Sequence, residues 1–219
     1  MANQEQYQLV QQWAQQGRSH SLVRFDLIEA VLAGIDLMGA NLTMANLNGA
    51  DLRGAYLTGA SLTLANLRET KLSGAFLGGV NLSGADLRGA DLSGAYLGQV
   101  DLREANLGNT LLSEADLGWA DLREAYLAGV DLRKADLTGA KLSWVDLSQA
   151  SLGEADLSEA DLRGASLRRA YLGGARLAGA DLREANLIQA YFFRATYTPE
   201  TRWPEGFVPQ RAGLSLEND

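Results

Sequence analysis

The chain has 219 residues, a formal net charge of −8 and no cysteine. The lack of cysteine excludes disulfides and thiol chemistry, and the acidic balance disfavours nucleic acids and anionic membranes, whose phosphates attract lysine and arginine. No run of roughly 18 apolar residues predicts a membrane span, and the first residues lack the basic and apolar segments of a signal peptide. We therefore expect a cytoplasmic protein.

The N-terminal residues 1–19 are predicted to form a helical cap. Tyr7, Val10 and Trp13 recur at three- to four-residue spacing among glutamines, which indicates an amphipathic helix over residues 4–16. Gly17 is suited to end this helix, because glycine adopts a positive φ at the least cost.

A five-residue repeat follows. Leucine occupies every fifth position from Leu22 to Leu187 without exception, and alanine is nearly as regular two positions before it. The exceptions at the alanine slot between Ala30 and Ala185 are Ile35, Thr70, Val80, Val100, Thr110, Val130 and Val145. This period fits neither an α-helix nor a strand. It is typical of a solenoid, in which stacked units bury one continuous core.

The unit Ala-(Asp/Asn/other)-Leu-x-x resembles that of the pentapeptide repeat family over residues 20–197. The resemblance implies an all-β fold, a right-handed quadrilateral β-helix in which four pentads form one coil, giving about nine coils in all. Leucine would fill the centre of each coil and alanine the space beside it, because four chain segments converge there. The buried leucines predict a core large enough for a stable monomer.

The corners between pentads are predicted from their glycines. The second residue after each leucine is often glycine, as in Gly54 and Gly79. A type II turn needs a positive φ at its second central residue, which explains glycine there. Where Glu, Gln, Trp or Arg takes this slot we expect a different turn, in line with the two turn types of the family.

The repeat ends at Phe192, which takes a leucine slot. Residues 198–219 contain all three prolines, which interrupt any regular ladder, and are predicted to form a C-terminal cap and tail. Tyr197, Trp203 and Phe207 are expected to fold over the last coil. The stretch Thr-x-Trp-Pro-x-Gly-Phe is similar to the flanks of cyanobacterial members of the family.

The sequence contains no pattern that indicates catalysis. A core of leucine and alanine leaves a convex surface and no pocket with convergent groups. His20 is the single histidine and is expected to pack in the cap, and no cysteine or second histidine completes a zinc site or a Ser-His-Asp set. We expect a protein that is not an enzyme and that binds no metal or cofactor.

Residues one coil apart are expected to stack on the outside of the rod. An aromatic column is predicted at Tyr56, Phe76 and Tyr96, and we interpret it as a structural ladder. A carboxylate column is predicted at Asp116, Asp136 and Asp156, and we interpret it as solvated rather than cation-binding. In the recurring Asp-Leu-Arg motifs the two charges point the same way, so most negative charge is locally compensated.

Two surfaces are candidates for binding a protein partner. Large apolar residues take outward positions, either as ordinary exposed residues or as a docking surface, since tryptophan is favoured at binding hot spots. They are Met44, Leu64, Trp119 and Trp144. The second surface is an acidic patch without a basic residue among Glu154, Asp156 and Glu159. Its members are Asp146, Glu154, Asp156, Glu159 and Asp161.

Two functions remain open on this sequence. The resemblance extends to a cyanobacterial regulator of heterocyst differentiation, which implies a non-enzymatic interaction scaffold with an unidentified protein partner. The quinolone-resistance members imply instead a DNA mimic that inhibits type II topoisomerase. The unbroken leucine register admits no inserted loop, the tail is proline-rich and most charges are compensated, so we favour the scaffold.

Overall fold

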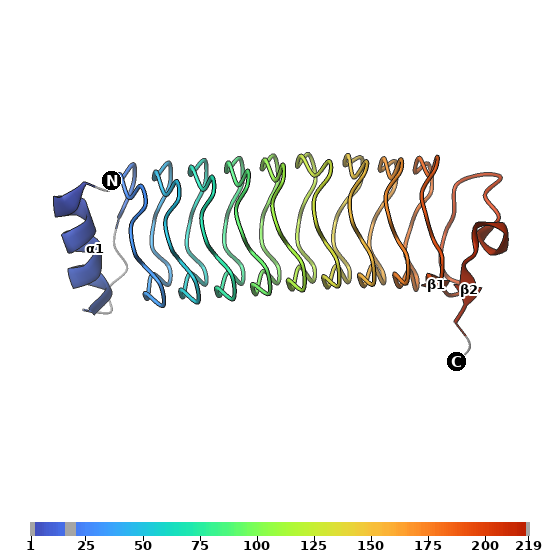
Figure 1. The fold of residues 1–219 in the computed structure, drawn as a ribbon, viewed down its shortest axis with the longest axis horizontal. Coiled ribbons are helices and arrows are strands. Elements are labelled where there is room, and N and C mark those ends of the chain that lie inside the picture. Colours follow the sequence, from blue (N-terminus) through green and yellow to red (C-terminus); the bar gives the residue numbers. More distant parts are fainter. Residues whose placement is uncertain (1–2, 16–20, 218–219) are drawn as a thin grey trace.

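The computed structural model describes residues 3–15 and 21–217 (Figure 1). The chain winds into an elongated stack of coils with helix α1 (Gln4–Gln15) at one end. At the other end lie strand β1 (Thr196–Tyr197), the 3₁₀-helix η1 (Pro209–Ala212) and strand β2 (Ser215–Leu216).

The coils stack through one bridging residue on each side. Residues 20 apart pair in parallel, from Ser21 with Asn41 to Arg176 with Thr196. In the pair of Asp26 with Asn46, Leu27 N donates to Asn46 O at 2.7 Å and Asn46 N donates to Phe25 O at 2.8 Å. Four pentads therefore complete one coil, as predicted. Each side of a coil is only a few residues long between corners and pairs through an isolated bridge. In the described residues, β1 and β2 are therefore the only strands longer than one residue.

The core is one continuous column of leucine and alanine. Every repeat leucine from Leu22 to Leu182 is buried, and so are the alanine slots from Ala30 to Ala185, whereas Phe25 in the preceding slot is partly buried. Two slots hold threonine, and both hydroxyls find acceptors: Thr70 Oγ1 donates to Leu47 O and Thr110 Oγ1 to Leu87 O, each at 2.9 Å. The column is thus packed and its buried polar groups are satisfied.

The corners correct one expectation from the sequence. Every fifth residue from Arg24 to Arg194 has φ between +56° and +72°, whether or not it is glycine. The hydrogen bond that closes the turn is also unchanged: Ala30 N donates to Leu27 O at 3.1 Å across Glu29, and Ala40 N to Leu37 O at 3.0 Å across Gly39. The expected second turn type at non-glycine corners is wrong. Stacking requires every corner to turn alike, which outweighs a local strain of roughly 1–2 kcal/mol per residue.

Helix α1 covers the first coil with its apolar side. Val10 is fully buried, and Tyr7, Trp13 and Ala14 pack against the core. The ring of Trp13 lies 6.0 Å from that of Phe25, measured between centroids. Gly17 and His20 lie outside the described residues.

The same segment also satisfies the polar edge of the first coil. Asp26 N donates to Gln6 Oε1 at 2.7 Å, and Asn3 N donates to Asp26 O at 3.1 Å. Tyr7 Oη donates to Val31 O at 3.0 Å. In later coils the equivalent backbone groups bond to the preceding coil. In the first coil the helical segment supplies these hydrogen bonds instead, so the edge is protected from pairing with another strand.

Aromatic rings of the C-terminal segment pack against the last coil. Phe192 is buried in its leucine slot, with its ring centroid 5.8 Å from Phe207 and 6.4 Å from Trp203. The Tyr197 ring lies 5.7 Å from Trp203. Strand β2 pairs with β1 in parallel, matching Thr196 with Ser215, which closes one side of this end.

Replacing Leu107 with aspartate should unfold the rod. Leu107 is fully buried, so an aspartate there is an unpaired buried charge and should reduce the free energy of unfolding by more than about 4 kcal/mol. The matched control is Leu111→Asp, because Leu111 occupies an outward bridging position and is 45% exposed. Urea unfolding followed by circular dichroism should place the control within about 1 kcal/mol of wild type. Equal losses in both variants would contradict the inward assignment.

Two corners one coil apart test the corner strain. Gly79 has φ +62° with no atom within 4 Å of an added Cβ, so Gly79→Ala should cost about 1 kcal/mol from the backbone conformation alone. Gln99 occupies the next corner of the same column at φ +59°, and Gln99→Gly should be neutral or stabilising by up to about 1 kcal/mol. Thermal melts of both variants measure whether the two corners share the same backbone strain. A harmless Gly79→Ala together with a clearly destabilising Gln99→Gly would refute a shared strained corner.

Candidate interaction surfaces

Glycine makes room for the large apolar corner residues. Leu64 lies against Gly84, where a Cβ would come 2.7 Å from Leu64 Cδ2. Trp119 lies in the same way against Gly139, where a Cβ would come 2.6 Å from Trp119 Cε3. Each side chain therefore lies over the corresponding corner of the following coil. Sequence reasoning missed this pairing, although its signal is present: a large corner residue followed 20 residues later by glycine.

Trp144 is the most exposed of these residues. It lies over Gly164, and 72% of its surface is accessible. Met44 is also exposed, but the next residue in its column is Leu64 rather than glycine.

The four predicted docking residues fall into two groups. Met44 and Leu64 occupy the same corner of adjacent coils, but Gly84, Glu104 and Glu124 follow in that column before Trp144. Trp119 and Trp144 occupy neighbouring corners. The structure therefore separates a Met44–Leu64 group near the N-terminal end from a Trp119–Trp144 group beyond the middle of the rod.

Two residues of the predicted acidic patch are neutralised by arginines. Asp156 Oδ2 lies 3.1 Å from Arg176 Nη1, and Asp161 Oδ2 lies 2.7 Å from Arg163 Nη2. The Asp156 pair was missed because Arg176 is one coil away and contacts it only through stacking. In the described part of the chain, Asp146, Glu154 and Glu159 have no ion pair within 4 Å.

The Asp-Leu-Arg motifs form bidentate pairs, as expected. Arg103 donates from Nε to Asp101 Oδ1 at 2.9 Å and from Nη2 to Asp101 Oδ2 at 2.7 Å. These hydrogen bonds lower the pKa of the aspartates below their ordinary range, and the arginine hydrogen bond is the largest cause in each. The aspartates concerned are Asp51, Asp86, Asp101, Asp121, Asp131, Asp161 and Asp181.

The aromatic column stacks as predicted. The ring centroids of Tyr56 and Phe76 lie 4.9 Å apart at an interplanar angle of 4°, and those of Phe76 and Tyr96 lie 4.9 Å apart at 3°. Each ring therefore covers the face of its neighbour. This leaves mainly ring edges for solvent, which favours a structural ladder over a platform for stacking bases.

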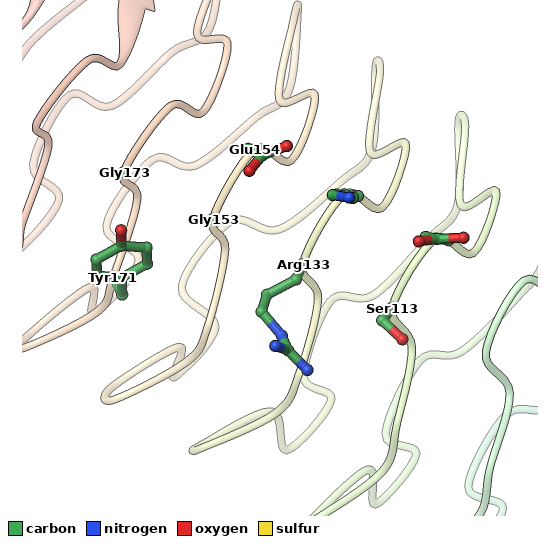
Figure 2. A pocket seen from close by; sticks show the side chains of 8 residues that line it. Ser113, Arg133, Gly153, Glu154, Tyr171 and Gly173 are labelled. Atoms are coloured by element: carbon green, nitrogen blue, oxygen red, sulfur yellow. The ribbon is translucent and has the colours of Figure 1, made fainter.

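A shallow polar hollow lies on the rod where glycines meet a large side chain (Figure 2). Gly153 and Gly173 make room for the Tyr171 ring, since a Cβ at Gly153 would lie 2.9 Å from Tyr171 Cε1. Arg133 and Glu154 stand on the other side of the hollow, whose volume is about 300 Å³. Arg133 is already bonded to Asp131, so the hollow lacks a free guanidinium for a ligand.

A second groove of about 550 Å³ lies at the C-terminal end, between residues 184–188 and 204–207. Within the described ranges, no group of three or more His, Cys, Asp or Glu side chains is placed to hold a metal ion. No helix in the same part of the chain is long and apolar enough to cross a membrane.

The chain belongs to the pentapeptide repeat family. Eight copies of the family model for pentapeptide repeats match overlapping segments between residues 21 and 196. Proteins of this family form right-handed quadrilateral β-helices, which agrees with the predicted fold class. A search of curated proteins finds no match.

Solved structures of other repeat proteins are similar to this rod. QnrB1, a plasmid-mediated fluoroquinolone resistance protein, is 22% identical with a TM-score of 0.67, covering 84% of this chain and 90% of its own. HetL from Nostoc, involved in the regulation of heterocyst differentiation, is 36% identical over 81% of this chain and 91% of its own, with a TM-score of 0.38. The Nostoc protein alr5209 is 43% identical over 47% of this chain and 84% of its own, with a TM-score of 0.46.

Acid should destabilise the rod through its Asp–Arg pairs. Because the folded-state pKa values of these aspartates are lowered, their stabilisation is present above the ordinary carboxyl pKa of about 3.9 and is lost as the pH falls through the folded values. The melting temperature should be nearly constant from about pH 7 to 5 and fall below about pH 4. In the double variant Asp101→Asn, Asp121→Asn this fall should be smaller. The same pH profile in the variant and the wild type would contradict the assignment.

Proposed function

We propose that this rod, of about nine coils, is a monomeric, cytoplasmic and non-enzymatic scaffold that binds a protein partner. The observation that supports this is the filled core: leucine is buried in every pentad from Leu22 to Leu182, and alanine, valine or another small side chain fills most of the slots beside it. A filled core leaves no space inside the rod for a water-excluding active-site pocket. What varies along the rod is the set of outward side chains, so recognition depends on them.

The Trp119–Trp144 group is the favoured docking surface. Both indoles are more than half exposed, and each lies over a glycine of the next coil, which supports it without burying it. Tryptophans presented in this way supply contact area at low entropic cost and are enriched at binding hot spots. Lys141 and Arg163, about half exposed, lie on the side of the rod between these corners and supply polar contacts around them.

The rival function is topoisomerase inhibition by mimicry of DNA. The net charge of −8 and the stacked carboxylates of Asp116 and Asp136, of which Asp136 is exposed, favour it. The likeness to QnrB1 bears on the fold alone, and regular Asp–Arg pairs neutralise much of the negative surface. We therefore favour the scaffold.

The variant Trp144→Ala should separate binding from stability. The loss of the indole should weaken partner binding more than about fivefold, which corresponds to about 1 kcal/mol. The melting temperature should stay within about 2 °C of wild type, because the side chain lies outside the core. The measurement is capture from native cytoplasm followed by titration of the purified partner. Tyr126→Ala, which removes a half-exposed aromatic residue on another side of the rod, is the matched control.

A supercoiling assay tests the rival directly. Inhibition of a type II topoisomerase at micromolar protein, lost in the double variant Glu154→Gln, Glu159→Gln and retained in Trp144→Ala, would overturn the scaffold proposal.

A further inference from the structure

The ladder of hydrogen bonds ends early on one side of the C-terminal end. Along the coils the N–H of a repeat leucine typically donates to the next coil, as Leu167 N does to Asn186 O at 2.9 Å. The chain continues this pattern as far as Arg202, whose carbonyl accepts from Leu182 N at 2.7 Å. Beyond Arg202 the chain leaves the ladder, and Phe207 N donates to Pro204 O at 3.1 Å instead of to the rod.

An open strand edge results. Among residues 3–15 and 21–217, no hydrogen-bond partner reaches the N–H groups of Leu187 and Gln189 or the carbonyl of Ala185. By the register of the preceding coils, both N–H groups point out of the end of the rod. They repeat the donor and acceptor spacing of the preceding coil, in which Leu167 N and Arg169 N donate to the parallel neighbour and Ala165 O accepts from it.

The groove of about 550 Å³ runs along this edge. The groove is shallow and open, its apolar lining includes Leu187, Ile188 and Phe207, and Ile188 is 60% exposed. Glu184 and Glu205 stand in its lining, and neither has an ion pair within 4 Å in the described part of the chain. The edge therefore combines unpaired backbone groups, apolar surface and negative charge.

We propose that this edge binds an extended segment of a partner protein, which adds to the rod as a parallel strand and carries apolar and basic side chains. Leu187 N–H, Gln189 N–H and the Ala185 carbonyl supply the backbone pairing, and such pairing is sequence-tolerant. The groove beside Ile188 and Phe207 accepts apolar side chains. Glu184 and Glu205 favour a lysine or arginine among them.

A second copy of this chain is the less favoured occupant. Two C-terminal ends that meet face to face would bring the carboxylates of Glu184 and Glu205 toward their equivalents, and like charges in an interface oppose association. The N-terminal end is covered by α1, which already satisfies its edge through Gln6 and Tyr7. The inference rests on the proposed interaction role but uses a surface separate from the Trp119–Trp144 group.

A displayed library of random nine-residue peptides, selected on the full chain, tests the proposal. We expect the selected peptides to combine lysine or arginine with β-branched or aromatic residues. Synthesised singly and titrated by fluorescence anisotropy, they should bind at least tenfold more weakly to Ile188→Glu and to Glu205→Lys. Amide hydrogen exchange should slow at Leu187 and Gln189 when peptide is bound, which reports the backbone pairing itself.

Two controls isolate this edge. Leu111→Glu changes an exposed apolar residue in a pentad that is bonded to the coils on both sides, and Trp144→Ala alters the other surface, so neither should change peptide affinity. Peptides whose affinity is indifferent to Ile188→Glu and Glu205→Lys, or unchanged exchange at Leu187 and Gln189, would overturn the proposal. A concentration-dependent dimer abolished by Ile188→Glu would also overturn it, by assigning the edge to a second copy. The two proposals fail independently. Trp144→Ala tests the Trp119–Trp144 group through partner capture, whereas Ile188→Glu and Glu205→Lys test the C-terminal edge through peptide binding.

Discussion

The convergence of leucine side chains at the centre of each coil is the constraint on which the rest of the structure depends. Burial of one leucine contributes roughly 1.5–3 kcal/mol, and the leucine of every pentad from Leu22 to Leu182 is buried. That repeated gain exceeds the strain of roughly 1–2 kcal/mol at a corner such as Glu29 or Trp144, both held at positive φ. Residues as different as Glu29 and Trp144 can therefore occupy a corner, provided that the inward leucine keeps its place.

The same constraint separates the interior from the surface. The alanine slot tolerates threonine only where its hydroxyl reaches a carbonyl, as Thr70 does at Leu47. Outward positions have no such requirement, so their side chains vary. Because residues 20 apart stack, these side chains form columns along the rod. Large side chains over glycines and carboxylates beside arginines are products of this stacking. The two ends differ because α1 satisfies the first edge, whereas the C-terminal segment leaves the ladder beyond Arg202.

The inward half of the structure could be predicted from the sequence because it depends on one period. The leucine slot followed from counting residues, and the 20-residue coil implied by the family resemblance placed the rings of Tyr56, Phe76 and Tyr96 in one column. The corner at Glu29 was predicted wrongly, because local preference for glycine was given more weight than the stacking of neighbouring coils.

The surface could be predicted only in part. The contact of Asp156 with Arg176 follows from stacking and could have been found by comparing residues 20 apart. The open edge at Leu187 could not, because it depends on the path taken after Arg202, where the period has ended. The prolines and glycine after Arg202 indicate that the repeat is interrupted, but they do not predict the path that the backbone takes beyond it.

Removal of one whole coil tests the central claim most directly. Deletion of residues 81–100 joins Val80 to Asp101 and returns every later leucine to its inward slot, so the shortened rod should fold and melt cooperatively like the full chain. Deletion of residues 81–99 leaves one extra valine and places each later leucine one position out of register. Hydrogen exchange should then show loss of protection beyond the junction. Equal protection and equal melting of the two deletions would contradict the claim that the inward leucine register determines this fold.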